Sequence, residues 1–183
     1  MADRISLQQF QTELARKLAE SAERPLGTGW LGVSWQGVRA LLPLAQAGEI
    51  FNPTALQHLP HTQPWVLGVA SLRGGLTVVA DWVRLLGLAP TVPMHATELD
   101  TVYWVSLNPA LGAGAALCVD HLLGLRQTQA WTREPIQPMH PALRAMWCDE
   151  AGQHWHELDL QALVQSPEFL DPRRPAFDLP ATA

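Results

Sequence analysis

Short runs of apolar residues, separated by glycine, proline and small polar groups, recur along most of this 183-residue chain. The runs are too short for long helices, and the turn-forming residues between them favour strands joined by tight connections. Fifteen prolines and thirteen glycines are spread among the runs, which strengthens this interpretation. The strands predicted in this way span residues 30–35, 38–44, 66–72, 76–80, 101–107, 115–119, 143–148 and 154–158.

The segments between these strands predict hairpins and loops. Gln36-Gly37 is a plausible two-residue hairpin turn, and further hairpins are expected about Arg73-Gly74-Gly75 and residues 149–152. Residues 45–51 are expected to form a short helical turn, while residues 120–128 are compatible with strand or turn. Two segments that each hold three prolines are expected to be loops, namely residues 52–64 and 132–142.

Three helices are predicted, together with a loose C-terminal tail. Apolar residues recur every three or four positions over residues 5–22, which is typical of an amphipathic helix. Asp81 and Asp159 each follow a predicted strand, so each carboxylate is placed to accept a backbone N–H as the N-cap of a short helix. Gly87 is placed to end the first of these short helices. The proline-rich tail from residue 167 onward is expected to be loosely attached.

A weak repeat relates the two halves of the chain. The pattern that begins at Asp81 and continues through Leu85-Leu86 is echoed by the pattern that begins at Asp159 and continues through Leu163-Val164. Two shorter echoes relate residues 33–34 to 105–106 and residues 40–44 to 116–120. The separations lie between 72 and 78 residues and keep their order. Three echoes in register predict two similar small barrels in tandem that share a buried seam.

Composition and charge exclude several classes of protein. The formal net charge is −5 and Lys17 is the only lysine, whereas nucleic-acid binding requires a basic face. No apolar run approaches the roughly 20 residues of a spanning helix, and the polar start of the chain does not read as a secretory signal. A cytoplasmic protein is therefore expected, without direct membrane insertion, with Cys118 and Cys148 as reduced thiols.

The sequence holds no pattern that indicates catalysis. Serine, histidine and aspartate are present, but no serine lies in a G-x-S-x-G segment of the kind that holds a catalytic nucleophile. The sequence also has no glycine-rich loop of the phosphate-binding form. His58 with His61, and His154 with His156, are spaced closely, yet a structural zinc site needs four ligands. No metal ion or cofactor is therefore predicted. One alternative stays open, a small β-barrel enzyme or ligand-binding protein whose pocket is lined by some of the eight tryptophans and the histidines.

Residues 65–88 carry a resemblance to one known family. They predict a strand, an Arg-Gly turn, a second strand and a short helix, and they resemble the CheW-like coupling domains of bacterial chemosensory systems. The chain departs from the family pattern at Ser71, Val78 and Trp82, which indicates a diverged member. The positions that match the family pattern are Gly68, Val69, Leu72, Arg73, Gly74, Asp81, Leu86 and Gly87.

The resemblance implies a fold and a function. The implied fold is mainly β, with two five-stranded SH3-like β-barrel subdomains packed together over residues 29–166. Residues 1–28 would form an N-terminal helix and linker, and residues 167–183 a proline-rich tail. The chain looks most like the PilI-type branch, which serves type IV pilus chemosensory pathways. The implied protein is a non-enzymatic adaptor that couples a methyl-accepting chemoreceptor signalling tip to the regulatory domain of a CheA-type histidine kinase.

The resemblance also points to a partner-binding region on the first barrel. It implies an ion pair between Arg73 and Glu49, the acidic residue of an x-x-E-I segment. This pair would brace the first barrel, shape the surface that receives a partner, or do both. Asp81 and Asp159 are expected to be structural caps rather than an acid–base pair. The expected contact residues are Glu49, Ile50, Gly68, Leu72, Arg73 and Gly74.

Overall fold

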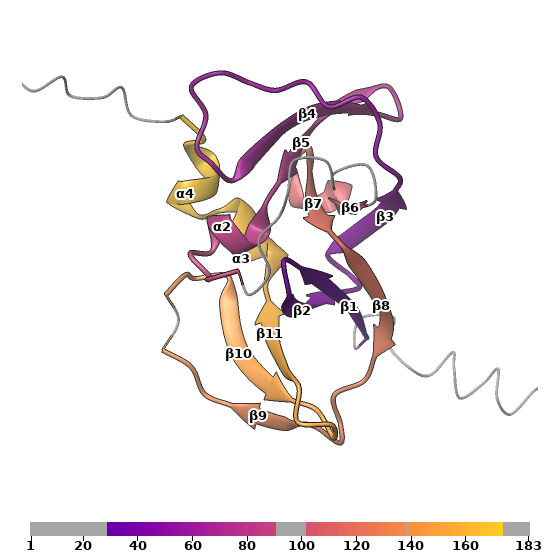
Figure 1. The fold of residues 1–183 in the computed structure, drawn as a ribbon, viewed down its shortest axis with the longest axis vertical. Coiled ribbons are helices and arrows are strands. Elements are labelled where there is room, and N and C mark those ends of the chain that lie inside the picture. The colour runs from indigo at the N-terminus through magenta and orange to yellow at the C-terminus, as the bar shows by residue number, and fades with distance from the viewer. Residues whose placement is uncertain (1–28, 91–101, 138, 174–183) are drawn as a thin grey trace, which may run out of the picture.

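Short β-strands are the main regular elements of the chain that the computed structural model describes, which is residues 29–90, 102–137 and 139–173 (Figure 1). The strands are β1 (Trp30–Trp35), β2 (Val38–Pro43), β3 (Ala47–Phe51), β4 (Val66–Leu72), β5 (Gly75–Ala80), β6 (Tyr103–Leu107), β7 (Ala115–Val119), β8 (His121–Arg126), β9 (Thr132–Glu134), β10 (Leu143–Cys148) and β11 (His154–Leu158). The helices are α2 (Trp82–Leu85), α3 (Leu160–Val164), α4 (Pro167–Leu170) and the 3-10 helix η2 (Pro109–Leu111).

All eight predicted strands are present, but two of the connecting segments differ from their predictions. Residues 45–51 are not a helical turn, because a turn closed by the Gln46 N–H to Pro43 O bond (2.9 Å) leads directly into β3, which pairs with β6. Residues 132–142 are not wholly loop, since β9 pairs with β10. The segment 120–128, which the sequence left open, contains β8.

The strands form two sheets that exchange hairpins between the halves of the chain. One sheet has the order β8-β1-β2-β11-β10-β9, and the other has the order β3-β6-β7-β5-β4. The β1–β2 hairpin therefore lies among strands of the second half, and the β6–β7 hairpin lies among strands of the first half (Figure 1). Each exchanged hairpin makes one parallel contact, β2 with β11 and β7 with β5. The predicted arrangement of two barrels in tandem is wrong in this respect.

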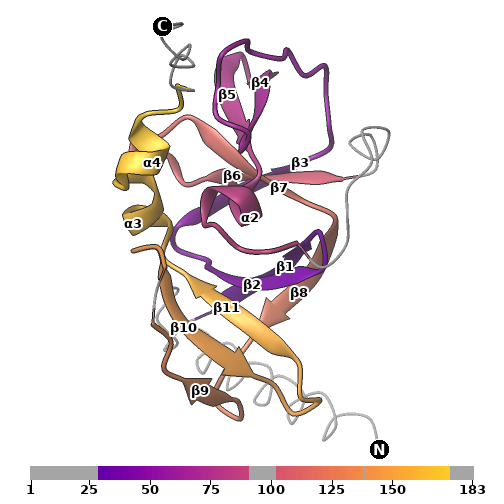
Figure 2. The ribbon, with the colours of Figure 1, turned by 60° about the vertical axis from the view of Figure 1, so that its left-hand side comes forward.

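The two sheets share one apolar seam, and α2 lies between the sheets (Figure 2). The side chains of Trp35, Trp82 and Trp104 are almost wholly buried, as are those of Leu117 and Leu158. These residues come from both sheets and from α2, so their burial joins the two barrels into one hydrophobic core. The tryptophans therefore serve mainly as packing groups.

Two aspartates fix the short helices that follow β5 and β11. Asp81 is fully buried, and its carboxylate accepts hydrogen bonds from the Arg84 N–H (3.0 Å) and from Gln36 Nε2 (3.1 Å) in the β1–β2 turn. Asp159 likewise caps α3 by accepting from the Ala162 N–H (3.1 Å). Each side chain therefore has the N-cap geometry expected from the sequence.

The segment after α3 is packed rather than loose. The N-terminal turn of α4 is capped by Ser166, and the Phe169 ring stacks on Trp65 with their centroids 5.8 Å apart. The Gln63 N–H donates to Pro172 O at 2.7 Å. The expectation of a loose tail is therefore wrong for residues 167–173. Residues 174–183 and the predicted helix at residues 5–22 lie outside the described residues.

Candidate partner-binding site

The predicted ion pair between Arg73 and Glu49 is present. Arg73 and Gly74 form a two-residue turn between β4 and β5, with φ angles of 50° and 77°. Arg73 Nη2 lies 2.5 Å from Glu49 Oε2, and the two side chains are 73% and 50% exposed. The pair therefore lies in water rather than against the core. The guanidinium therefore does not need the carboxylate to offset burial.

This ion pair connects opposite edges of the five-stranded sheet. Glu49 lies on β3 and Arg73 follows β4, and these two strands are the first and last of that sheet. Contact between them requires the sheet to curl until its edges approach, as in a small barrel. An exposed pair of this kind contributes no more than about 1 kcal/mol to stability. The pair also joins the β4–β5 turn to β3.

A cavity of about 360 Å³ opens beside the ion pair at the mouth of this barrel. Ser106 fixes its β3 wall, because Ser106 Oγ accepts from the Glu49 N–H (2.8 Å) and donates to Glu49 O (3.1 Å). The cavity is thus bounded by a charged rim and a largely apolar floor. Its lining includes Gly48, Glu49, Phe51, Leu72, Arg73, Thr77, Ser106, Leu107 and Pro109.

The remaining predicted contact residues divide into exposed and buried positions. Ile50 is 45% exposed and Gly74 lies at the exposed tip of the turn. Gly68 and Leu72 are buried, so neither presents a side chain to a partner. They support the surface from beneath instead. The structure therefore exposes four of the six predicted residues, Glu49, Ile50, Arg73 and Gly74, and the ion pair brings Glu49 to the turn.

Gly68 has a specific structural role in β4. It lies in a β-bulge opposite β5, with φ of 152°, and a Cβ built on it would come within 2.6 Å of Gln57 O. Gln57 bonds to Val69 through both backbone groups, at 2.8 and 2.9 Å, and so covers the outer edge of β4. Only glycine allows this close approach.

Sequence reasoning missed one exposed apolar residue beside this turn. Leu76 on β5 is 79% exposed and pairs across the hairpin with the exposed Ser71. Strand alternation could have shown it, because Leu76 and Ser71 share one face of the hairpin and a serine is an unusual core residue. Leu76 lies three residues after Arg73 and Ile50 directly follows Glu49, so exposed apolar side chains flank both members of the ion pair along the chain.

A serine, an aspartate and a histidine do meet elsewhere, but their geometry is not that of a nucleophile. Ser34 Oγ donates to Asp120 Oδ1 (2.5 Å) and also lies 3.3 Å from His121 Nδ1. The same histidine nitrogen faces Asp120 Oδ1 at 2.9 Å. A catalytic base needs one ring nitrogen for the hydroxyl and the other for the carboxylate. Here both partners share Nδ1, so the group is structural.

The thiol of Cys118 is equally unsuited to catalysis. The residue is fully buried on β7 in the core. Burial raises the pKa of this thiol far above its usual value, and the charges of Asp81 and Asp120 act in the same direction. A thiol that stays protonated is a poor nucleophile. Cys118 therefore serves as a small apolar packing group, as expected from the sequence.

A second cavity, of about 430 Å³, lies under the 58–64 loop. His58 and His61 line it together with Arg84, but His58 Nδ1 is already 3.0 Å from Leu67 O. Among the described residues that line either cavity, none is a tryptophan. The alternative of an enzyme or ligand-binding protein with a pocket of tryptophan and histidine thus gains no support from these cavities.

The two sheets and their common core define a protein built of two joined small β-barrels. None of the helices in the described part of the chain is long and apolar enough to cross a membrane. The profile of the CheW-like domain family matches residues 30–168, and the chain belongs to this family.

Two known proteins illustrate the relationship. Protein PilI of Pseudomonas aeruginosa is 28% identical over 163 residues, which cover 85% of this chain and 88% of that protein. The crystal structure of the scaffolding protein TtCheW from Thermoanaerobacter tengcongensis superposes with a TM-score of 0.60 at 14% identity. That match covers 78% of this chain and 95% of the other, and it shows a common fold.

Proposed function

We propose that this protein is a cytoplasmic adaptor that couples a methyl-accepting chemoreceptor to a CheA-type histidine kinase. The observation that carries the proposal is the family match over residues 30–168, which includes both barrels. Similarity to PilI along most of the chain favours a chemosensory pathway that controls type IV pili. The protein would lie beside membrane receptor arrays and would bind neither nucleic acid nor the bilayer directly.

The adaptor needs protein interfaces and no chemistry of its own. One surface would bind the signalling tip of the receptor, and another would bind the regulatory domain of the kinase. By holding the two partners in a fixed relation, the adaptor would let the receptor's conformational state bias the activity of the kinase. Two distinct surfaces on one rigid body suffice for this role.

The surface around the β4–β5 turn is the proposed contact region on the first barrel. Arg73 and Glu49 supply charge, while Ile50 and Leu76 supply exposed apolar area. An arginine beside apolar residues is a frequent composition at the centre of protein interfaces. Gly74 keeps the turn tip free of a side chain, and the buried Gly68 and Leu72 hold the turn in place.

A binding assay with purified components tests this proposal. The full chain is combined with the kinase regulatory domain and, separately, with a receptor signalling tip from its own organism. We expect the wild-type protein to bind both. Arg73→Glu should weaken binding of at least one partner by about tenfold or more, because it removes an interface arginine and places a second negative charge beside Glu49. If the wild-type protein bound neither partner, the adaptor role would be refuted.

Two control variants separate a direct contact from a general effect of charge. Arg173→Glu changes an arginine that is 83% exposed and, like Arg73, is paired with an exposed carboxylate, Asp171. It should leave both affinities unchanged. The double variant Arg73→Glu with Glu49→Arg restores the ion pair in reverse. Recovery of binding would assign the pair a bracing role, and continued loss would assign Arg73 a direct contact.

A further inference from the structure

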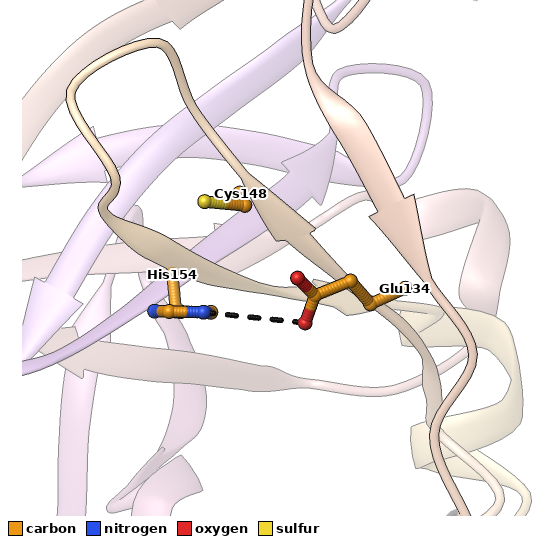
Figure 3. A group of neighbouring side chains, drawn as sticks. All are labelled: Glu134, Cys148 and His154. Atoms are coloured by element: carbon orange, nitrogen blue, oxygen red, sulfur yellow. Dashed lines mark ion pairs between the residues drawn. The ribbon is translucent and has the colours of Figure 1, made fainter.

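Glu134, Cys148 and His154 meet on one face of the six-stranded sheet, each from a different strand (Figure 3). Cys148 on β10 is directly opposite His154 on β11. Glu134 on β9 pairs with Met146, two residues before Cys148, so strand alternation directs Glu134 and Cys148 to the same face. The three ligand atoms lie within 4.8 Å of one another, and His154 Nε2 is 4.0 Å from Glu134 Oε2.

The donor set matches the preference of a borderline-soft divalent metal. Thiolate, imidazole and carboxylate are the three side-chain ligands of zinc, whereas calcium and magnesium select oxygen alone. Tetrahedral zinc with bonds of about 2.0–2.3 Å places its ligand atoms roughly 3.3–3.8 Å apart. The observed cluster is slightly wider than this. Glu134 and His154 are exposed, so small rotations of their side chains suffice to close it.

We propose that Glu134, Cys148 and His154 bind one zinc ion, with a water molecule as the fourth ligand. Binding converts the Cys148 thiol to a thiolate, and its proton passes to the solvent. Neither oxidant nor reductant is required. The site is independent of the surface around Arg73, because its ligands belong to the other sheet.

Zinc at this position would hold the shortest strand of the sheet in place. β9 has three residues, all exposed, and lies at the edge of the six-stranded sheet. A metal bond from Glu134 would tie it to the β10–β11 hairpin. His156, two residues along the same face from His154, has a buried Nδ1 without a hydrogen-bond partner among the described residues. The same face of the sheet therefore has a buried histidine nitrogen that makes no hydrogen bond to the described residues.

The test uses the full chain kept reduced, with zinc and cobalt as the probes. Zinc affinity and stoichiometry are measured by competition with a chromophoric chelator, and Co²⁺ is added separately to record its absorption spectrum. We expect one equivalent of zinc, and a thiolate-to-cobalt charge-transfer band that Cys148→Ser abolishes. Zinc should raise the melting temperature of the wild-type protein, since it binds the folded state. A cobalt spectrum without a thiolate band would overturn the proposal.

Single variants of the three ligands decide whether they act as one site. Mutation of groups that only support the ligands of a metal site costs about 10- to 100-fold in metal affinity, and loss of a direct ligand should cost at least as much. We therefore expect zinc affinity to fall at least tenfold in each of the variants His154→Ala, Glu134→Gln and Cys148→Ser. The matched control is His61→Asn, an exposed histidine in the 58–64 loop that should leave the affinity unchanged. Since His154 and Glu134 are exposed, their variants retain the fold. Equal affinity in the wild type and both of these variants would disprove the site.

Discussion

Arg73 and Gln36 occupy the same position in two different hairpins. Each has φ near 50° and is followed by a glycine with φ of 77° or 78°. Two-residue turns of this kind match the twist of antiparallel strands. The same backbone serves two purposes, because Gln36 is buried and donates to Asp81, whereas Arg73 is exposed and pairs with Glu49. Tertiary surroundings, rather than the turn itself, assign each side chain its role.

At the residue scale, Gly68→Ala should destabilise the protein. The new Cβ would meet Gln57 O at 2.6 Å, and the φ of 152° is poorly accessible to alanine. We expect the free energy of unfolding to fall by about 1–3 kcal/mol. Gly75→Ala is the matched control on the same hairpin, because its Cβ would meet its nearest neighbour at 3.6 Å. Urea unfolding of both variants measures the difference, and equal losses would contradict this account of Gly68.

At the scale of elements, α2 and α3 are held in place by the same kinds of contact. Each begins with an aspartate N-cap, and each cap also accepts from a glutamine in the connection before or after β2. Gln36 Nε2 donates to Asp81 at 3.1 Å, and Gln46 Nε2 donates to Asp159 at 3.2 Å. Gln46 Oε1 also accepts from the Leu160 N–H at 2.7 Å. These short helices therefore owe their positions to contacts with β1–β3 as well as to their own sequence.

Asp159 makes α3 sensitive to acid. Partial burial acts to raise the pKa of its carboxyl, but hydrogen bonds from Arg144, the Ala162 N–H and Gln46 outweigh burial and hold the pKa below its usual 3.8. Because the folded-state pKa is the lower one, the stabilisation is present above 3.8 and is lost as pH falls through the folded value. Asp159 thus contributes stability at neutral pH that disappears in acid.

The variant Asp159→Asn tests this pH dependence. Asparagine is an equally good N-cap, so the variant removes the charge and leaves the helix start intact. At neutral pH the wild type should be more stable by about 1 kcal/mol or less, since Arg144 is half exposed. The difference should vanish at the acid end of a pH series of urea unfolding. A difference that persists there, or that appears equally in Glu150→Gln at an exposed position, would contradict the assignment.

At the scale of the whole molecule, the exchange of hairpins makes the two halves interdependent. The β1–β2 hairpin lies between β8 and β11, which both come from the second half. The β6–β7 hairpin lies between β3 and β5 of the first half. Neither half can therefore complete a sheet alone, and an isolated hairpin is at best marginally stable in water. Both barrels and the seam should unfold as one cooperative unit.

Separate expression of the two halves tests this interdependence. The chain is divided within residues 91–101, which lie outside the described part and between the two repeats. Each half alone should show little β-structure by circular dichroism, and mixing them should restore it together with a single unfolding transition. The uncut chain is the reference. A half that folds by itself would show that its barrel is complete without the exchanged hairpin.

The sequence allowed much of the local structure and of the site to be predicted. The eight apolar strands, the Asp81 and Asp159 caps and the turn at Arg73 follow from short-range rules of periodicity, capping and turn geometry. The Arg73–Glu49 pair came from the family resemblance, not from those rules. β3 and β9 were missed because their burial is low, so the alternation that marks a half-buried strand is weak in both.

Short-range patterns determined by themselves where strands, turns and helix caps lie, because each pattern acts over a few residues. Only the tertiary structure decided which strands share a sheet, since the repeat is equally compatible with tandem and exchanged hairpins. It also decided that the Arg73 pair is exposed, and it brought Glu134 of β9 to Cys148 and His154. Pairing partners are chosen by burial of the common seam, which depends on contacts between residues far apart in the chain.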